Sequence, residues 1–313
     1  MNYPWNHHRR YNDFPTHFKQ MFDGQRVQKV SIDAGFTCPN RDGKLAKNGC
    51  AYCNNKTFKP DYCRIEETIT EQVEKGIQFF TQKYQSMQFL GYFQAYTNTY
   101  ASLDVLRQKY EEALQHEKII GLVIGTRPDC LASELLDYLE ELAQHYYIMV
   151  EFGIESTNDR TLQRINRGHD YATAVRAIEE TTKRGIHNCG HLILGLPGET
   201  RKDFLNQACE ISKLPIENIK LHQLQIHRGT QLAKDYANNP DEFNLFSLED
   251  YLELCVDYLE LLHPRIIVER FISQSPKDML IAPKWGVKNF EFVAKLEKRL
   301  EERDTWQGKH FEL

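Results

Sequence analysis

The sequence has 313 residues, of which 41% are hydrophobic and 27% are charged, a balance typical of a globular protein with one sizeable core. The formal net charge is −5, which excludes a global basic field that would draw the chain to nucleic acid or to an anionic membrane. The first residues, MNYPWNHHRR, lack the apolar core of a signal peptide, and no apolar run approaches the roughly 20 residues that span a bilayer. We therefore expect a cytoplasmic protein without membrane contact.

Short apolar runs alternate with longer amphipathic stretches along the chain. The apolar runs predict strands over residues 27–33, 90–95, 119–125, 147–153, 188–194 and 219–224. The amphipathic stretches predict helices between them, over residues 68–84, 103–116, 132–145, 171–184 and 202–213. Asp170 and Thr200 precede two of these helices and suit N-caps, and Gly185 suits a left-handed C-cap.

Strands that alternate with helices predict βαβ units and a parallel sheet. Such units can form a doubly wound sheet or a barrel, complete or partial, and periodicity alone leaves these architectures open. Polar residues follow every predicted strand, at 33–35, 94–98, 126–129, 151–156, 195–199 and 223–228. In a barrel of parallel strands these ends meet on one rim, where active sites form, although loops are often polar without a function.

Three of the eight cysteines, Cys38, Cys50 and Cys53, lie close together directly after the first predicted strand. The other five stand alone, and a lone cysteine is most often a small buried hydrophobe: Cys63, Cys130, Cys189, Cys209 and Cys255. A Cys-x-x-Cys pair lets two thiolates from one turn reach one metal centre, and soft thiolates select zinc or iron–sulfur clusters. The three grouped cysteines therefore indicate a metal centre.

The cysteine group leaves several kinds of site open. A structural zinc ion needs a fourth ligand, for which Cys63 or a nearby histidine is available. A thioredoxin-like pair at Cys50 and Cys53 would begin a helix and would have no third cysteine beside it. A cubane cluster with three protein ligands keeps one iron open, which can chelate the amine and carboxylate of S-adenosylmethionine (SAM). Electron transfer into SAM then yields a 5′-deoxyadenosyl radical, and we favour this interpretation.

The run Cys-Pro-Asn-Arg-Asp-Gly at 38–43, followed by Gly-Cys-x-x-Cys-Asn at 49–54, resembles the YhcC/YtqA-type radical SAM proteins, which are relatives of the elongator catalytic subunit. Eleven residues separate the first two cysteines, a spacing found in this branch of the superfamily. Further matches extend the resemblance over roughly residues 22 to 270, at 92–97, 125–130, 164–170, 191–199 and 220–222. The resemblance implies a partial (β/α)6 TIM-like barrel over 22–270, an N-terminal extension over 1–21 and a helical C-terminal extension over 271–313.

The resemblance also implies one [4Fe–4S] cluster held by Cys38, Cys50 and Cys53, and contacts with SAM from the strand ends. The residues after the second strand would meet the methionine amine: Gln94, Tyr96 and Asn98. Glu151 and Glu155 alternate on the fourth strand, so both can point inward, and one of them would meet the ribose or the methionine. Glu151 is otherwise a strand-end residue paired with a lysine.

Two further places in the chain are assigned to SAM by the resemblance. Arg167 would pair with the SAM carboxylate, a bidentate contact that suits a guanidinium, or it would simply close a helix C-terminus. The fifth strand ends near the adenine, at Gly195, Pro197 and Gly198, where glycine permits close backbone approach; a simple turn is the alternative. The roles of other groups near strand ends stay open: Cys63, Cys130, Cys189, His191, His222 and His227.

The radical chemistry does not define the substrate. Because elongator-type relatives are associated with wobble uridines, the resemblance points to modification of a tRNA wobble uridine side chain, with flavodoxin or ferredoxin as electron donor. Cations at 7–10 and 277–309 can hold phosphates, although glutamates interleave with the second group. A radical SAM enzyme acting on a small molecule or a peptide is the first alternative, and a non-catalytic zinc or iron–sulfur protein is the second.

Overall fold

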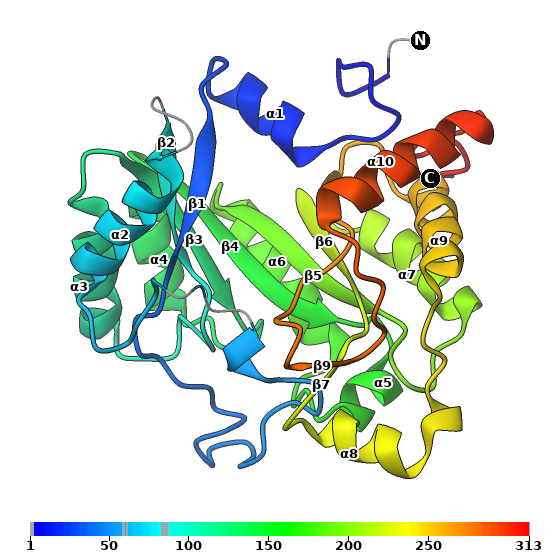
Figure 1. Ribbon diagram of the computed structural model, residues 1–313. Helices are drawn as coiled ribbons and strands as arrows, with labels where there is room; N and C mark the ends of the chain where they lie inside the picture. Colours follow the sequence, from blue (N-terminus) through cyan, green and yellow to red (C-terminus); the bar gives the residue numbers. More distant parts are fainter. Residues whose placement is uncertain (1–2, 58–59, 61, 83–86, 313) are drawn as a thin grey trace.

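A computed structural model describes residues 3–57, 60, 62–82 and 87–312, and its centre is a parallel sheet that curls into part of a barrel (Figure 1). The strand order is β1-β2-β3-β4-β5-β6-β8, so neighbours in the chain are neighbours in the sheet. The strands are β1 (Val27–Ile32), β2 (Gln88–Phe93), β3 (Ile119–Thr126), β4 (Tyr147–Glu155), β5 (His187–Leu194), β6 (Asn218–Gln223) and β8 (Ile267–Arg270).

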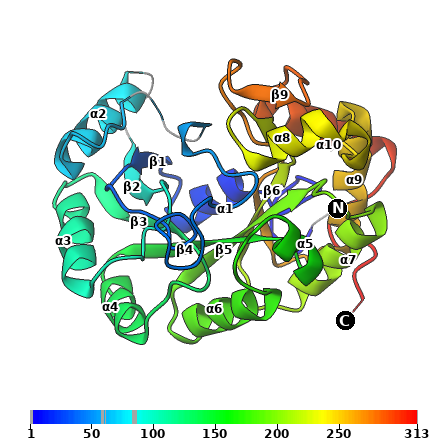
Figure 2. The same cartoon turned by 90° about the horizontal axis from the view of Figure 1, so that it is seen from below.

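The crossover helices cover the outer face of the sheet, as Figure 2 shows in the view along the strands from their carboxyl ends. They are α2 (Ile69–Thr81), α3 (Leu103–Leu114), α4 (Ser133–Ala143), α6 (Tyr171–Lys183) and α7 (Arg201–Ser212), with the short α5 (Asp159–Arg164) after β4. The predicted partial (β/α)6 barrel is therefore confirmed, and β8 adds a strand that was not predicted. Lys83 and Tyr84, the predicted end of the first crossover helix, lie outside the described residues.

The local sequence accounts for the ends of these helices. Thr68 and Thr200 each accept a hydrogen bond from the third helical residue, whose carboxylate bonds back to the threonine, so α2 and α7 begin with capping boxes. Asp170 caps α6, as its position predicted. Gly185 follows α6 with φ +66°, the left-handed conformation that glycine adopts without a steric penalty.

Alternation along each strand divides the buried residues into two layers. In β4, Val150, Phe152 and Ile154 are fully buried against the helices, because these positions share one face of the strand. The other face looks into the barrel, where an inner cluster comprises Leu90, Tyr92, Val123, Met149, Cys189 and Phe18. Phe18 comes from α1 (Phe14–Met21), which closes the amino-terminal end of the barrel and is visible through its centre in Figure 2.

The C-terminal part of the chain packs on the same core. It contains β7 (Ile226–His227), α8 (Gln231–Asn238), α9 (Leu248–Leu261), β9 (Leu280–Ala282) and α10 (Asn289–Glu302), and α9 and α10 contribute buried side chains to the outer layer. The N-terminal segment runs beside α10, where Arg9 pairs with Glu297 and Arg10 pairs with Asp304. The arginines at 9 and 10, predicted as phosphate contacts, thus meet carboxylates of the same chain. No helix among the described residues is long and apolar enough to cross a membrane.

Candidate active site

The loop between β1 and α2 carries Cys38, Cys50 and Cys53 across the carboxyl end of the sheet, and all three line one cavity of about 210 Å³. The three thiols are free. The loop is fixed to the end of α5, because Asn166 donates to the Gly49 carbonyl at 2.7 Å and the Ala51 amide donates to the Ile165 carbonyl at 2.8 Å. The cysteines are therefore held by backbone contacts to the barrel.

The spacing of the thiols distinguishes a cluster from a single ion. Four ligands at a Zn–S distance of about 2.3 Å bring the sulfur atoms within roughly 4 Å of one another. Among the described residues, the sulfur atoms of Cys38, Cys50 and Cys53 do not form a set in which all lie within 4.8 Å of one another. Donors also face the sulfurs, since Asn40 Nδ2 lies 3.4 Å from Cys50 Sγ. The donor set and the spacing fit a polynuclear cluster better than a mononuclear zinc site.

Arg167 lies beside the cysteines and is almost fully buried. Its Nη1 is 3.5 Å from Cys50 Sγ, and its Nη2 donates to the Gly153 carbonyl at 2.7 Å. Nη2 also lies 3.8 Å from Glu155, whose carboxylate accepts a hydrogen bond from Tyr52 at 2.8 Å. A Cβ at Gly153 would lie 2.5 Å from both Arg167 Nη2 and Glu155 Oε1, so an alanine there would displace the ends of these two side chains.

Strained backbone occurs at the cavity rim. Tyr96 and Glu155 line the cavity with φ of 63° and 69°, a conformation that side chains rarely adopt. At Glu155 the strain accompanies a bulge, because Gly153 pairs with His191 and Glu155 with the next residue, Leu192. The bulge turns the Glu155 carboxylate towards Arg167 and Tyr52. Gln94 also lines the cavity, at the end of β2.

Four of the residues assigned to SAM do not line the cavity: Asn98, Gly195, Pro197 and Gly198. The Asn98 amide is buried and donates to the carbonyls of Phe93 and Gly125, at 3.0 and 2.7 Å, so it ties two strand ends together. Gly195 and Gly198 have φ of 101° and 91°, which forms the turn from β5 into α7. The neighbouring residue that does line the cavity is Ile193.

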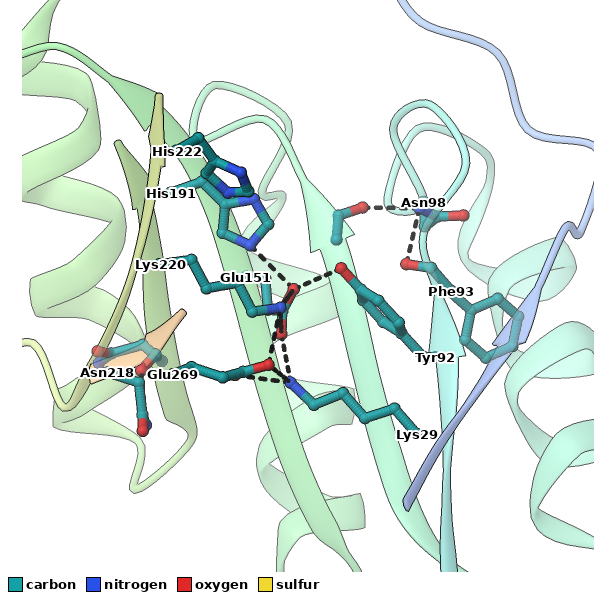
Figure 3. Close-up of polar contacts among 12 residues, drawn as sticks. Lys29, Tyr92, Phe93, Asn98, Glu151, His191, Asn218, Lys220, His222 and Glu269 are labelled. Carbon is teal, nitrogen blue, oxygen red and sulfur yellow. Dashed lines mark hydrogen bonds and ion pairs between the residues drawn. The ribbon is translucent and has the colours of Figure 1, made fainter. Parts of the chain in front are cut away.

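A cluster of charged and polar groups lies inside the barrel (Figure 3), and four of its members line the cavity: Tyr92, Glu151, His191 and Lys220. We call it the charged floor: Lys29, Tyr92, Glu151, His191, Lys220 and Glu269. Glu151 is its centre and accepts hydrogen bonds at 2.7–3.0 Å from Lys29, Lys220, Tyr92 and His191. Glu269 bonds to Lys29 at 2.7 Å and pairs with Lys220 at 3.2 Å. The two lysines and two glutamates balance, so the charged floor is neutral when His191 is neutral.

The charged floor fixes the protonation of its members. Burial by itself would raise the pKa of Glu151, but Lys220 and Lys29 outweigh it and lower that pKa well below its ordinary value. Burial opposes the charge of Lys220, yet Glu151 and Glu269 raise the pKa of this lysine. Glu151, Cys189 and His191 offer ligand atoms within 4.8 Å of one another, but both Glu151 oxygens already bind Lys220. This trio is therefore part of the charged floor and not a free metal site.

Sequence reasoning had assigned Glu151 either to SAM or to a lysine pair, and the structure provides the lysines. It had not identified Lys29 or Lys220 as partners, although both are charged residues inside predicted strands, which is an available signal for a buried polar site. Arg127 was also missed as an individual residue. It is buried at the cavity wall, where its Nε and Nη2 bond to the Asp129 carboxylate at 2.9 and 2.8 Å.

The side chains whose roles the sequence left open differ in whether they line the cavity. His191, His222 and His227 line the cavity, whereas Cys130 and Cys189 do not. Burial lowers the pKa of His227 to about 4 and raises the pKa of Cys130 to about 12. Both groups are consequently neutral near pH 7.

Comparison with known proteins agrees with this geometry. Residues 43–206 match the family model of the radical SAM superfamily, and residues 216–302 match that of the radical SAM C-terminal domain. The chain is 37% identical to YtqA of Bacillus subtilis over 98% of this chain and 94% of that protein. It is 36% identical to YhcC of Escherichia coli over 89% of each chain.

Among solved structures, the archaeal Elp3 of Methanocaldococcus infernus has a similar fold, with a TM-score of 0.70 and 15% identity over 90% of this chain and 64% of that one. The half-barrel, the cysteine loop at its mouth and the sequence matches agree with one another. The chain belongs to the radical SAM superfamily, whose enzymes use a [4Fe–4S] cluster and SAM.

Proposed function

We propose that Cys38, Cys50 and Cys53 hold the [4Fe–4S] cluster and that the protein modifies the side chain of a wobble uridine in tRNA. The observation that supports the first part is the convergence of three free thiols on one cavity with the Arg167 guanidinium at Cys50 Sγ. When bound, the cluster supplies the electron that cleaves SAM into methionine and a 5′-deoxyadenosyl radical.

The protein's own residues bind and orient SAM in this proposal. Arg167 and Glu155 lie side by side next to the cysteines, so a guanidinium and a carboxylate are available for the carboxylate and the amine of the methionine. Gln94 and Tyr96 supply further polar groups from β2. Tyr52 donates to Glu155 and keeps its carboxylate oriented. The apolar ring of Tyr52 also limits the access of water to this side of the cavity.

Two observations support tRNA as the substrate. The tRNA uridine(34) acetyltransferase of Methanocaldococcus jannaschii is 23% identical over 50% of this chain and 28% of that protein. In addition, the cysteine loop and the turn before α8 carry exposed cations, of which the first lines the cavity: Arg41, Lys44, Lys47 and Arg228. Arg41 lies 5.7 Å from the Tyr96 ring and Lys44 5.3 Å from the Tyr100 ring. Cations beside aromatic rings suit phosphates and unstacked bases.

The test of the radical chemistry is anaerobic reconstitution, reduction with dithionite, addition of SAM and chromatography of 5′-deoxyadenosine. Cys50→Ala and Cys53→Ala should lose the iron and the product together, because each removes a cluster ligand. Cys209→Ala is the matched control, since Cys209 lies on α7 away from the cavity and should keep both. Zinc bound tightly in place of iron would contradict the proposal.

The tRNA part is tested separately. Bulk tRNA from a strain that lacks the gene is incubated with the reconstituted protein and SAM, digested to nucleosides and compared by mass spectrometry. We expect one wobble nucleoside to change in mass. If tRNA stays unchanged while a small molecule or a peptide stimulates SAM cleavage, the substrate assignment is wrong and the radical assignment stands.

A further inference from the structure

The last strand of the sheet contains a bulge at the cavity. Ile219 of β6 pairs with Val268, and Lys220 pairs with Arg270, so Glu269 is an extra residue without a partner. In a regular strand, Glu269 and Arg270 would point to opposite faces of the sheet. Here Glu269 bonds to Lys29 inside the charged floor, and Arg270 lines the cavity as well. The bulge therefore turns two consecutive charged side chains towards the interior.

Arg270 differs from the other cations of the cavity wall in having no partner among the described residues. Lys220 is paired with Glu151, Arg127 with Asp129, and Arg167 with the Gly153 carbonyl. No hydrogen bond or ion pair joins Arg270 to another described residue, although its side chain is only partly exposed. The two glutamates of the charged floor already pair with its two lysines, so Arg270 contributes a positive charge that no described carboxylate pairs with. A guanidinium that lines a cavity and has no protein partner is available to bind an anion.

A second unpaired group lies next to Arg270. Ser273 bonds to His222 Nδ1, whereas His222 Nε2 is buried without a partner. Burial, followed by the charges of His191 and Arg270, lowers the pKa of His222 well below its ordinary value, so the imidazole is neutral. When Ser273 donates to Nδ1, Nε2 carries the hydrogen and is a donor. Arg270 and the tautomer of His222 that carries its hydrogen on Nε2 thus offer neighbouring donors without a partner among the described residues.

Arg270, His222 and Ser273 line the same cavity as the cysteines, and Arg270 and Ser273 also line a second one. The cavity that holds the cysteines meets a second cavity of about 1340 Å³, which lies along the open edge of the sheet between β1 and β8. Residues shared by both cavities mark the junction: Tyr92, Gln94, Lys220, Arg270 and Ser273. Arg270 is the last residue of β8, and its side chain lines both cavities.

We propose that Arg270, with His222 beside it, binds an oxyanion of the substrate, a carboxylate or a phosphate, at the junction of the two cavities. This inference rests on the proposed function, because it divides the site into a SAM half at Arg167 and a substrate half at Arg270. A guanidinium binds either oxyanion in a bidentate manner, and the neutral His222 adds one donor. The substrate would then be held with its anionic group where the cysteine cavity meets the larger one.

Variants of Arg270 test whether the residue binds the substrate or SAM. Arg270→Gln should raise the KM for the tRNA substrate by about 30-fold, the loss expected for one charge-assisted contact, with a smaller effect on kcat. Arg270→Lys keeps the charge without the bidentate geometry and should recover part of that loss. Arg176→Gln, on the exposed side of α6, is the matched control and should leave KM unchanged. An equal increase in the dissociation constant of SAM in Arg270→Gln would overturn the proposal.

Arginine labelling tests the oxyanion site without any use of tRNA, so its outcome is independent of the proposed substrate. Phenylglyoxal should modify Arg270 faster than the paired Arg127 and Arg167 in the reconstituted protein, as measured by peptide mass spectrometry. Acetate and inorganic phosphate, each at a saturating concentration, are compared as protecting anions. At least one should slow the labelling of Arg270 by about fivefold, and the stronger one identifies the class of oxyanion. Protection by SAM alone, or by neither anion, would show that this site does not bind a substrate oxyanion.

Discussion

Replacement of Lys220 by methionine tests whether the charged floor is one coupled unit. The Lys220 side chain is 2% exposed, and its ammonium contacts both Glu151 oxygens at 2.7 Å and Glu269 at 3.2 Å. Its loss leaves two buried carboxylates with Lys29 alone. Removing one partner of a buried ion pair costs about 3–5 kcal/mol. With an unfolding entropy of about 2.1 cal/mol/K per residue, this free energy lowers the melting temperature by about 5 to 8 °C.

The double variant Lys220→Met with Glu269→Gln provides the decisive comparison. It removes one charge of each sign and leaves Lys29 with Glu151, a neutral pair with its hydrogen bonds intact. We therefore expect the double variant to unfold at a higher temperature than Lys220→Met alone. If instead the two losses add, the groups act independently and the reasoning is refuted. Lys183→Met, which removes an exposed lysine beside Glu180, is the control and should leave the melting temperature unchanged.

The cost of Lys220→Met should also depend on pH. The folded-state pKa of Glu151 is lowered, so its contribution to stability is present above about pH 4.5 and is lost as the pH falls. Without Lys220 that pKa rises, and the carboxyl group can take up a proton in the folded protein. The difference in melting temperature between wild type and Lys220→Met should accordingly be smaller at pH 5 than at pH 8.

Three further predictions concern single residues, two at the cavity and one, Glu199, outside its lining. Burial raises the pKa of Glu199 to about 7 in the folded protein, whereas the unfolded chain releases this proton near pH 4.5. The free energy of unfolding therefore falls as the pH rises between these two values. Glu199→Gln should remove that fall and be more stable than wild type at pH 8 by about 3 kcal/mol, measured by unfolding at pH 5 and pH 8. Arg167→Met removes the donor to Cys50 Sγ and should lower the reduction potential of the cluster by on the order of 50–100 mV. The potential is measured by a redox titration followed by electron paramagnetic resonance, and an unchanged value would contradict the contact. Gly153→Ala forces Arg167 and Glu155 apart and should weaken SAM binding by about tenfold, measured by calorimetry, while the iron content is retained. An unchanged affinity would show that these two residues do not bind SAM.

The repeating part of the fold was predictable from the sequence because its signals are local. Buried parallel strands are continuous apolar runs, and caps such as Thr200 and Asp170 mark the helix starts. The strand β8 was not predicted, since Ile267–Arg270 is short and half of it is charged. Its place in the sheet depends on pairing with β6, a contact between distant parts of the chain.

The site was predictable only where residue type and spacing by themselves indicate the chemistry. The three cysteines belong to that class, whereas Arg167 was assigned from the family resemblance, and all four residues line the cavity. Asn98 was assigned to SAM by its position after β2, but a side chain at a strand end can also turn back to bond carbonyl groups, as the Asn98 amide does. The partners of Glu151 come from β1, β2, β5 and β6, and only the closed curvature of the sheet brings them together. Sequence spacing does not predict contacts between residues so far apart in the chain.

The composition of the charged floor has a consequence for how the chain folds. Lys29 lies in the first strand and Glu269 in the last, so two directly bonded partners are separated by 240 residues of sequence. A nascent chain that ends before β8 places Lys29 and Lys220 in the barrel with Glu151 as their only carboxylate partner in the floor. Contacts of such high sequence separation slow folding, because the long loop must close before the contact forms. The two lysines of the charged floor can therefore both be balanced by its glutamates only after synthesis of nearly the whole chain, and this favours a single late closure over stepwise addition of βα units.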